Sequence, residues 1–209
     1  KQHSSAAFTK IELLVVVGVV LVLGVLLYTN LRPTKHVASE IDCSAKLMHQ
    51  GGAFSAFAND HNDLFPASVS TNTGGSLEYA DFGNQTYRHF QSLSNMVDAP
   101  SYLVCPTDKR QSATAWNALK NENLSYFVAV NARRSDSGCL LAGDRNLTTR
   151  TNIVVDLATE KVQWEPSVGL HEMRGNILFG DGRVRQLDSI ELKEILQSDT
   201  NATNRLSIP

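Results

Sequence analysis

Residues 8–31 read FTKIELLVVVGVVLVLGVLLYTNL, and this stretch decides how the chain is organised. No residue between Leu13 and Leu31 is charged, and Arg32 ends the run. At about 1.5 Å of rise per residue, the run forms ~28 Å of helix, close to the ~30 Å hydrocarbon core of a bilayer. The sequence therefore predicts one helix able to cross a membrane, with the acid Glu12 at its N-terminal edge.

A cleaved secretory signal and a permanent anchor are the ordinary alternatives for such a segment. A secretory signal has about 7–15 apolar residues followed by small residues at the cleavage site. The run here is longer, and residues 27–33 offer no such site, which disfavours that route. An anchor stays open, although a carboxylate beside an apolar span is costly in lipid and normally marks a function.

The start of the segment, FTKIELLVV at residues 8–16, resembles the processing signal of type IV pilins and type II secretion pseudopilins. In that family a prepilin peptidase cuts before the Phe and methylates the new amine. The Glu four residues later pairs with the amine of a neighbouring subunit. The resemblance implies processing between Ala7 and Phe8 and makes Glu12 the assembly residue. Ala7 replaces the family's Gly, and Lys10 replaces its usual Leu.

Residues 1–7 are expected to be a leader or an N-terminal extension. If they are retained, Glu12 cannot meet the N-terminal amine in the usual register. Lys10 is then the expected local countercharge, since it lies one turn or less from Glu12.

The remaining residues, 32–209, are enough for one domain with a core. The chain has 19 basic and 21 acidic residues and a formal charge of −2, which does not indicate nucleic-acid binding. No cofactor is predicted, and no metal site is the favoured interpretation of any residue pattern.

Residues 32–60 are predicted to continue the helix in amphipathic form. Pro33 is expected to bend or break it at residues 30–32, because proline removes a backbone donor. Apolar residues then recur at helical spacing: Val37, Ile41, Ala45, Met48 and Gly52. Oxygen-bearing side chains crowd residues 59–63; a calcium site is one interpretation, and an ordinary helix-to-turn transition is the favoured one.

Residues 61–209 are predicted to form a globular head with a long polar loop at 67–100, a short helix near 88–96, and a β-sheet within 101–187. Expected strands are 102–105, 124–131, 138–142 and 152–157, with 162–164 pairing back on the last. Residues 175–180 and 183–187 form the clearest hairpin, with Asp181-Gly182 in a type I′ turn. Asp188 and Glu191 are expected to cap a final helix to about residue 197, followed by an extended tail.

Three cysteines, Cys43, Cys105 and Cys139, follow the apolar segment, and none has the C-x-x-C spacing of a zinc knuckle. An exported domain faces an oxidising compartment, which permits a disulfide. We favour Cys43 with Cys105, because that pair would tie the long helix to the head. The alternative for each cysteine is a buried thiol.

A second resemblance covers most of the chain. The sequence has a histidine followed by nine residues and then Asp-Gly, at His171 and Asp181-Gly182. This spacing is similar to the signature of the H-X9-DG pilin-like family. Further fragments follow in the family's order: residues 42–47, 59–66, 104–108, 141–146 and 176–182. A catalytic role for His171 with Asp181 or Asp144 would need a nucleophile or water within reach.

The structural interpretation of these residues is favoured: Asp181-Gly182 makes the turn, and His171 bonds a loop backbone. Residues 143–146 are expected to form a turn with an internal Asp–Arg ion pair. Enzyme motifs such as G-x-S-x-G, H-E-x-x-H or a Walker loop do not occur in the sequence. The chain is therefore not expected to be an enzyme.

Together these features predict an α+β, pilin-like lollipop: a long N-terminal helix packed on an antiparallel head with a short C-terminal helix. The expected function is that of a type IV pilus-like filament subunit. It would sit in the bacterial inner membrane and then polymerise with copies of itself at the cell surface. Its expected partners are the peptidase and the pilus or secretion machinery. A minor pseudopilin and a membrane-anchored binding module are the alternatives.

Overall fold

The computed structural model describes residues 9–157, 160–165, 170–171, 173–198 and 205–209, with the backbone alone for residues 29–38. Contacts between residues divide the chain into two units, residues 1–38 and residues 39–209. We call the second unit the head. It includes the C-terminal part of the long helix, so it begins earlier than the predicted boundary at residue 61.

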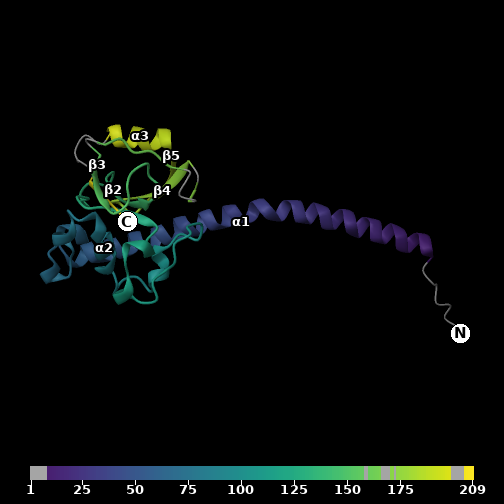
Figure 1. The fold of residues 1–209 in the computed structure, drawn as a ribbon, viewed down its shortest axis with the longest axis horizontal. Helices are drawn as coiled ribbons and strands as arrows, with labels where there is room; N and C mark the ends of the chain where they lie inside the picture. The colour runs from purple at the N-terminus through teal and green to yellow at the C-terminus, as the bar shows by residue number, and fades with distance from the viewer. Residues whose placement is uncertain (1–8, 158–159, 166–169, 172, 199–204) are drawn as a thin grey trace. The chain divides into compact units, whose positions relative to one another are not determined.

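Figure 1 shows the order of the elements along the chain. The α-helices are α1 (Lys10–Asp60), α2 (Thr86–Gln91) and α3 (Ser189–Ser198). The strands are β1 (Tyr126–Ala129), β2 (Leu140–Asp144), β3 (Ile153–Asp156), β4 (Arg174–Phe179), β5 (Val184–Asp188) and β6 (Arg205–Ile208). Short 3-10 helices are η1 (Pro66–Ser68), η2 (Thr71–Thr73), η3 (Leu77–Tyr79), η4 (Gly83–Gln85), η5 (Pro100–Leu103), η6 (Trp116–Ala118) and η7 (Asn121–Asn123). The structure therefore has an α+β architecture.

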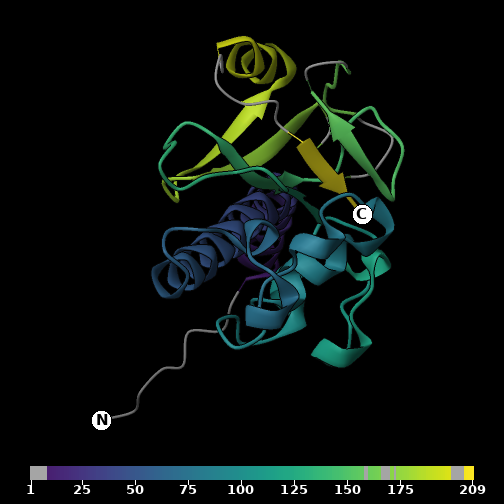
Figure 2. The ribbon, with the colours of Figure 1, turned by 90° about the vertical axis from the view of Figure 1, so that its left-hand side faces the viewer.

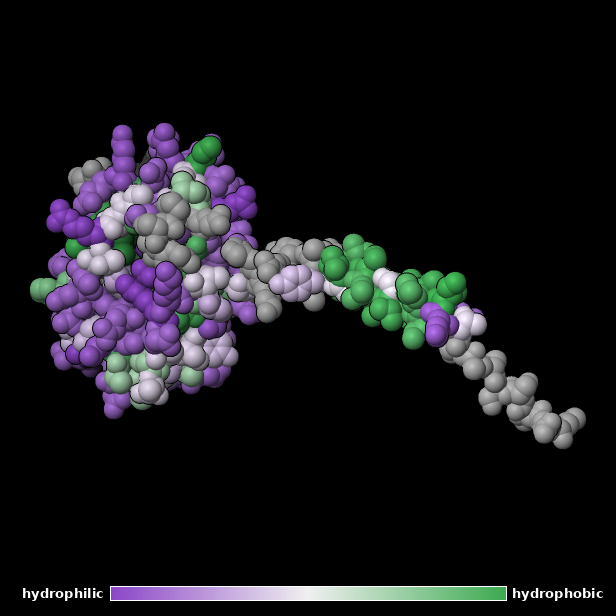
Figure 3. All heavy atoms as spheres, turned by 45° about the vertical axis from the view of Figure 1, so that its right-hand side comes forward, coloured by the Kyte–Doolittle hydropathy of each residue, from purple (hydrophilic) through white to green (hydrophobic). Residues whose placement is uncertain are grey.

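The N-terminal part of α1 carries its apolar side chains on the outside. Every large hydrophobic residue from Ile11 to Tyr28 is between 50% and 76% exposed, and Figure 3 shows them as a green surface. By length and composition, residues Lys10–Tyr28 form the one described helix able to cross a membrane, a test that signal sequences also pass. The helix break predicted as one alternative at Pro33 is wrong, because α1 runs through Pro33 as one 51-residue helix.

The head is built on a six-stranded antiparallel sheet in the order β3-β6-β1-β2-β4-β5. Figure 2 shows the sheet between α3 on one side and α1 on the other. Side chains alternate between the faces, so Phe127 and Ile177 line the α3 side with Leu192. On the opposite face, Leu178 lies against Gly51 of α1, where an added Cβ would come within 2.8 Å of it.

The apolar residues of α1 within the head form two stripes. The buried stripe packs on the sheet and on the loops that follow α1: Cys43, Leu47, Phe54 and Ala58, with the polar Gln50 buried among them. The stripe predicted from the sequence lies on the other side of the helix and is exposed at Ile41, Ala45, Met48 and Gly52. We call these exposed residues the outer stripe. The side chain of Val37, the remaining member of the predicted stripe, lies outside the described residues. Both sets have helical spacing, and the larger Leu and Phe side chains occupy the core because they remove more apolar surface from water.

Two of the predicted strands are wrong. Residues 102–105 fall partly in η5, where Pro100 starts a 3-10 turn. Trp164 bridges to Leu147 instead of pairing with β3, and the strand that pairs with β3 is β6 from the tail. The tail is therefore a strand of the sheet, inserted between β3 and β1.

The β4–β5 hairpin is confirmed, although its turn differs from the predicted one. Gly182 has φ +86°, whereas Asp181 does not adopt positive φ. The amide of Gly182 donates to Phe179 O at 2.9 Å, and Phe179 N donates to Arg183 O at 2.9 Å. This is a three-residue connection with a left-handed glycine at its end, so only one position requires glycine.

The predicted cap of the final helix is also confirmed. Asp188 Oδ1 accepts from the amides of Ile190 and Glu191, and Glu191 Oε2 accepts from Asp188 N.

Candidate functional site

A disulfide joins α1 to the loop after η5. Cys43 and Cys105 are the bonded pair, with Cα atoms 5.0 Å apart and a sequence separation of 62. Both are fully buried, and the pair is the one favoured from the sequence. Cys139 is buried elsewhere, and its thiol donates to Arg133 O at 3.3 Å.

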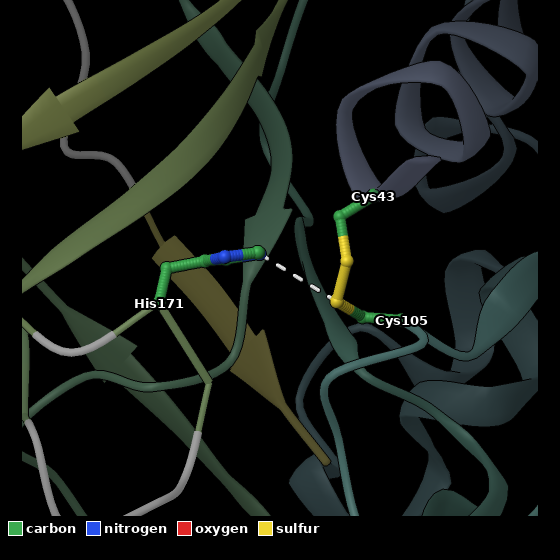
Figure 4. Close-up of side chains that lie close together, drawn as sticks. All are labelled: Cys43, Cys105 and His171. Carbon is green, nitrogen blue, oxygen red and sulfur yellow. Dashed lines mark hydrogen bonds between the residues drawn. A yellow bond between two sulfur atoms is a disulfide. The ribbon is translucent and has the colours of Figure 1, made fainter. Parts of the chain in front are cut away.

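His171 lies beside this disulfide, as Figure 4 shows. Its Nε2 is 3.5 Å from Cys105 Sγ and 3.5 Å from Asp144 Oδ2. Its Nδ1 is 3.9 Å from Glu40 Oε1. The imidazole and the Asp144 carboxylate are both fully buried. We call Cys43, Cys105, His171 and Asp144 the disulfide cluster.

Strand pairing places Asp144 in the cluster. Asp144 ends the buried strand β2 opposite Tyr126, on the face of the sheet toward α1. Asn176 of β4 donates to Asp144 Oδ2 from its backbone and its side-chain amide, at 2.6 and 2.9 Å. Burial raises the pKa of Asp144 to about 6, while His171 and Asn176 act in the opposite direction.

The motif residues Asp181 and Gly182 are not part of this cluster. Asp181 Oδ1 accepts from the backbone amide of Arg183, and its other oxygen binds the Arg183 side chain. In the described part of the chain, no hydrogen bond or ion pair joins His171 to Asp181. The turn role predicted for Asp181 and Gly182 is thus confirmed. The backbone bond predicted for the His171 ring is wrong, because the ring faces Asp144 and the disulfide.

A second buried charge pair lies nearby. Arg145 donates both arms of its guanidinium to Asp108, at 2.8 Å each, and Ser125 adds a bond at 2.8 Å. Burial would raise the pKa of Asp108, but Arg145 and Ser125 outweigh it and lower the pKa. The internal ion pair predicted within residues 143–146 is therefore wrong, since Arg145 turns to Asp108 and Asp144 to the cluster.

The predicted assembly residues lie at the start of α1. Thr9 and Glu12 form a reciprocal capping box: Thr9 N and Oγ1 donate to Glu12 Oε2 at 2.9 Å, and Glu12 N donates to Thr9 Oγ1 at 3.3 Å. Lys10 is exposed and is the first residue of the helix. Ala7 and Phe8, the predicted processing residues, lie outside the described residues.

The side-chain oxygen atoms of the calcium interpretation lie at the C-terminal end of α1. Arg134 binds Asn59 Oδ1 and, at 3.1 Å, Asp63 Oδ1. The ring nitrogens of His61 lie 2.8 Å from Phe57 O and 3.0 Å from Thr73 O. A protein cation thus lies where that interpretation would place a metal ion, which favours the alternative of a helix-to-turn transition.

In chemical terms the disulfide cluster is a cross-link. It ties four segments together: α1, the loop after η5, β2 and the residues before β4. The sulfur atoms are bonded to each other, so neither is a nucleophile in this state. Among the described residues, the hydrogen bonds and ion pairs of the His171 ring reach only Cys105, Asp144 and Glu40.

Each member of the disulfide cluster was singled out in the sequence, but their proximity in the fold was not predicted. One signal was available: Asp144 is a lone acid at the end of an otherwise uncharged, fully buried run, residues 139–144. A second missed signal is the T-x-x-E pattern at Thr9 and Glu12, which indicates a capping box.

Comparison of this chain with family models, with curated proteins and with solved structures found no match. The resemblances to pilins therefore stay predictions. The function has to be argued from the apolar helix, its capping acid and the head.

Proposed function

We propose that this chain is a structural subunit of a type IV pilus-like filament that polymerises through its N-terminal apolar helix. The observation that carries the proposal is the surface of residues Lys10–Tyr28, with mean hydropathy 2.8 and none of its most apolar window buried in the protein. Such a surface is unfavourable in water, at roughly 25 cal/mol per Å². Lipid would cover it before assembly, and the helices of sibling subunits would cover it afterwards.

Glu12 is the proposed register residue of this assembly. Its exposed carboxylate binds only Thr9 among the hydrogen bonds described for it. Burying that charge among apolar helices would be costly without a cation. A countercharge from the next subunit, its N-terminal amine or Lys10, would remove this penalty at one axial spacing only.

The outer stripe of α1 supports the same assembly. Ile41 is 63% exposed and Met48 58% exposed, although they lie in an amphipathic helix whose other side is fully packed. Apolar residues repeated at three- and four-residue steps are typical of helix–helix contacts. A second copy of this chain is the proposed partner of the stripe.

The head is consistent with an exported protein. Its disulfide fits an oxidising compartment, and we place the subunit in the bacterial inner membrane before assembly and on the cell surface after it. A prepilin peptidase and the pilus or secretion machinery are its proposed partners. We propose no catalytic role, since the His171–Asp144 pair is closed inside the head.

The decisive experiment separates the charge of Glu12 from its capping role. Glu12→Gln keeps an acceptor for Thr9, because Gln also serves in a capping box, but removes the charge. In cells that supply the assembly machinery, we expect Glu12→Gln and Glu12→Ala to insert in the membrane and to lose sedimentable filaments. Glu122→Gln, on the exposed surface of the head, is the matched control and should assemble normally.

Three outcomes decide between the candidates. Filaments of normal length from Glu12→Gln would show that the charge sets no register. If wild-type protein is extracted only as detergent-soluble monomers, the chain is a membrane-anchored module. If the chain makes up a minor fraction of purified fibres, it is a minor pseudopilin.

A further inference from the structure

The disulfide cluster contains side chains that can bind a metal ion, besides the two bonded cysteines. Sulfur and nitrogen atoms of Cys43, Cys105 and His171 lie within 4.8 Å of one another. Asp144 brings a carboxylate oxygen to within 3.5 Å of the same ring nitrogen, Nε2. Two thiolates, an imidazole and a carboxylate are all groups that bind Zn²⁺.

The spacing of these atoms fits a tetrahedral ion. Bonds of about 2.3 Å to sulfur and about 2.0–2.2 Å to nitrogen and oxygen place neighbouring ligand atoms roughly 3.3–3.8 Å apart. The distances from His171 Nε2 to Cys105 Sγ and to Asp144 Oδ2 are both 3.5 Å. Asp144 is not in the group of atoms that all lie within 4.8 Å of one another. On reduction the two sulfur atoms would therefore have to separate from each other and move toward Asp144, by rotation of their side chains.

Two buried atoms of the cluster have no hydrogen-bond partner. They are Asp144 Oδ1 and His171 Nδ1, in side chains that are fully buried. An unpaired buried polar atom is costly and calls for an explanation. A cation bound by the Asp144 carboxylate and Nε2 would bring a positive charge to this carboxylate, whose Oδ2 already accepts from Asn176. It would also fix the ring so that Nδ1–H points to Glu40. A carboxylate that accepts from the second ring nitrogen of a ligating histidine is common at zinc sites.

We propose that the reduced chain binds one Zn²⁺ through Cys43, Cys105 and His171, with Asp144 as the fourth ligand. Binding to the two thiols releases two protons. When a protein disulfide then oxidises the site, the two thiolates give two electrons to that disulfide. The partner becomes two thiols by taking up two protons, the Cys43–Cys105 bond forms, and Zn²⁺ leaves unchanged. Zinc and the disulfide are thus alternative cross-links of the same four segments.

This site would matter for the newly made chain, which carries thiols before it meets an oxidant. Zinc would hold α1 on the head in that state, because ligand binding to the folded form adds to its stability. The inference does not depend on filament assembly, and its test contains no assembly step.

The test uses the full chain in detergent micelles, reduced with a phosphine and titrated first with Co²⁺ and then with Zn²⁺. We expect one Co²⁺ per chain with sulfur-to-cobalt charge-transfer and tetrahedral ligand-field bands, displaced by Zn²⁺. Zinc should raise the melting temperature of the reduced chain and leave that of the oxidised chain unchanged. Cys139→Ser is the matched cysteine control and should bind like the wild type.

Variants then assign the ligands. Cys43→Ser and Cys105→Ser should lose the charge-transfer bands. His171→Gln should weaken Zn²⁺ binding by more than the ~10–100-fold typical of an outer neighbour, and Glu40→Gln should fall within that range. Asp144→Asn should change the ligand-field bands. Circular dichroism checks that each reduced variant is folded. If Asp144→Asn is unfolded, the Glu40→Gln result tests whether His171 binds the metal through Nε2, the nitrogen that faces Asp144.

Two results would overturn the inference. The first is the absence of stoichiometric metal binding by the reduced wild type. The second is binding that His171→Gln leaves unaltered, which would mean that the thiols bind metal without the folded site.

Discussion

The two halves of α1 present apolar side chains in opposite ways. Along residues 10–28 every large hydrophobic residue is exposed on all sides of the helix. Along residues 39–60 the same residue types divide into a buried face, with Leu47 and Phe54 fully buried, and an exposed outer stripe, with Ile41 and Met48. The first half has no polar face, whereas the second half has a sheet against which to pack.

The difference shows that helical spacing alone does not identify the core side of a helix. The second half offers two apolar stripes, and the sheet takes the one with the larger side chains. The outer stripe and the whole surface of residues 10–28 are left for lipid or for other chains. Substitutions on the two sides of α1 should therefore act on different processes.

The largest effect is expected from the buried face. Phe54→Ala removes a ring that packs edge-on against Phe65 and Phe90, and should cost about 3–5 kcal/mol of unfolding free energy. Met48→Ala, on the outer stripe, should change it by no more than about 0.5 kcal/mol. Urea denaturation of the full chain in micelles measures both. Equal losses would show that the two stripes are not divided as described.

Removing the disulfide should have the next largest effect. The bond closes a loop of 62 residues, for which the chain-entropy model gives about 4 kcal/mol. The double variant Cys43→Ser, Cys105→Ser should therefore unfold at much lower urea, and reduced wild type in the presence of a chelator should behave in the same way. Cys139→Ser is the control for loss of a buried thiol. A double variant as stable as the wild type would mean that packing alone holds α1 on the head.

The buried histidine of α2 should make the head, but not the apolar segment, sensitive to acid. His89 is fully buried, its ring hydrogen-bonds Ser76 at 2.7 Å, and burial lowers its pKa to about 4. The unfolded chain, with a histidine pKa of about 6.5, binds the proton more tightly. Stability is therefore fully present above about pH 6.5 and falls as the pH drops toward 4, by roughly 2–3 kcal/mol.

His89→Gln should remove this part of the pH dependence. Denaturation of wild type and variant at several values between pH 7 and pH 4 measures the difference between their slopes. If the two curves run parallel, protonation of His89 is not the cause of the acid sensitivity.

Much of this fold follows from the sequence because local signals and packing agree. The uncharged run after Glu12, the Asp181-Gly182 turn and the Asp188 cap each predict the element that forms. The misassignments arise where packing over long distances decides. Residues 205–208 form a strand only because the sheet has a place for them between β3 and β1, and no local pattern indicates this.

The candidate site was predictable in its parts and not in its geometry. The pairing of Cys43 with Cys105 follows from export and from the need to tie the helix to the head. The meeting of His171 with Asp144 depends on the register of β2 against β4, which puts Asp144 beside Asn176. From the sequence, His171 could be set beside Asp181 or Asp144 only as alternatives, because sequence distance does not show which side of a strand faces the site.

The smallest effect is expected where α1 ends. Arg134 binds Asn59 and Asp63 at an exposed position: the Asp63 side chain is 73% exposed. Exposed pairs of this kind contribute roughly 0.2–1 kcal/mol, so Arg134→Ala should lower stability by no more than that, and added salt should shrink the difference. The same variant tests the alternative cation. If calcium stabilises Arg134→Ala but not the wild type, the oxygens at the end of α1 form a metal site that the guanidinium blocks; if it stabilises neither, this turn needs only the arginine.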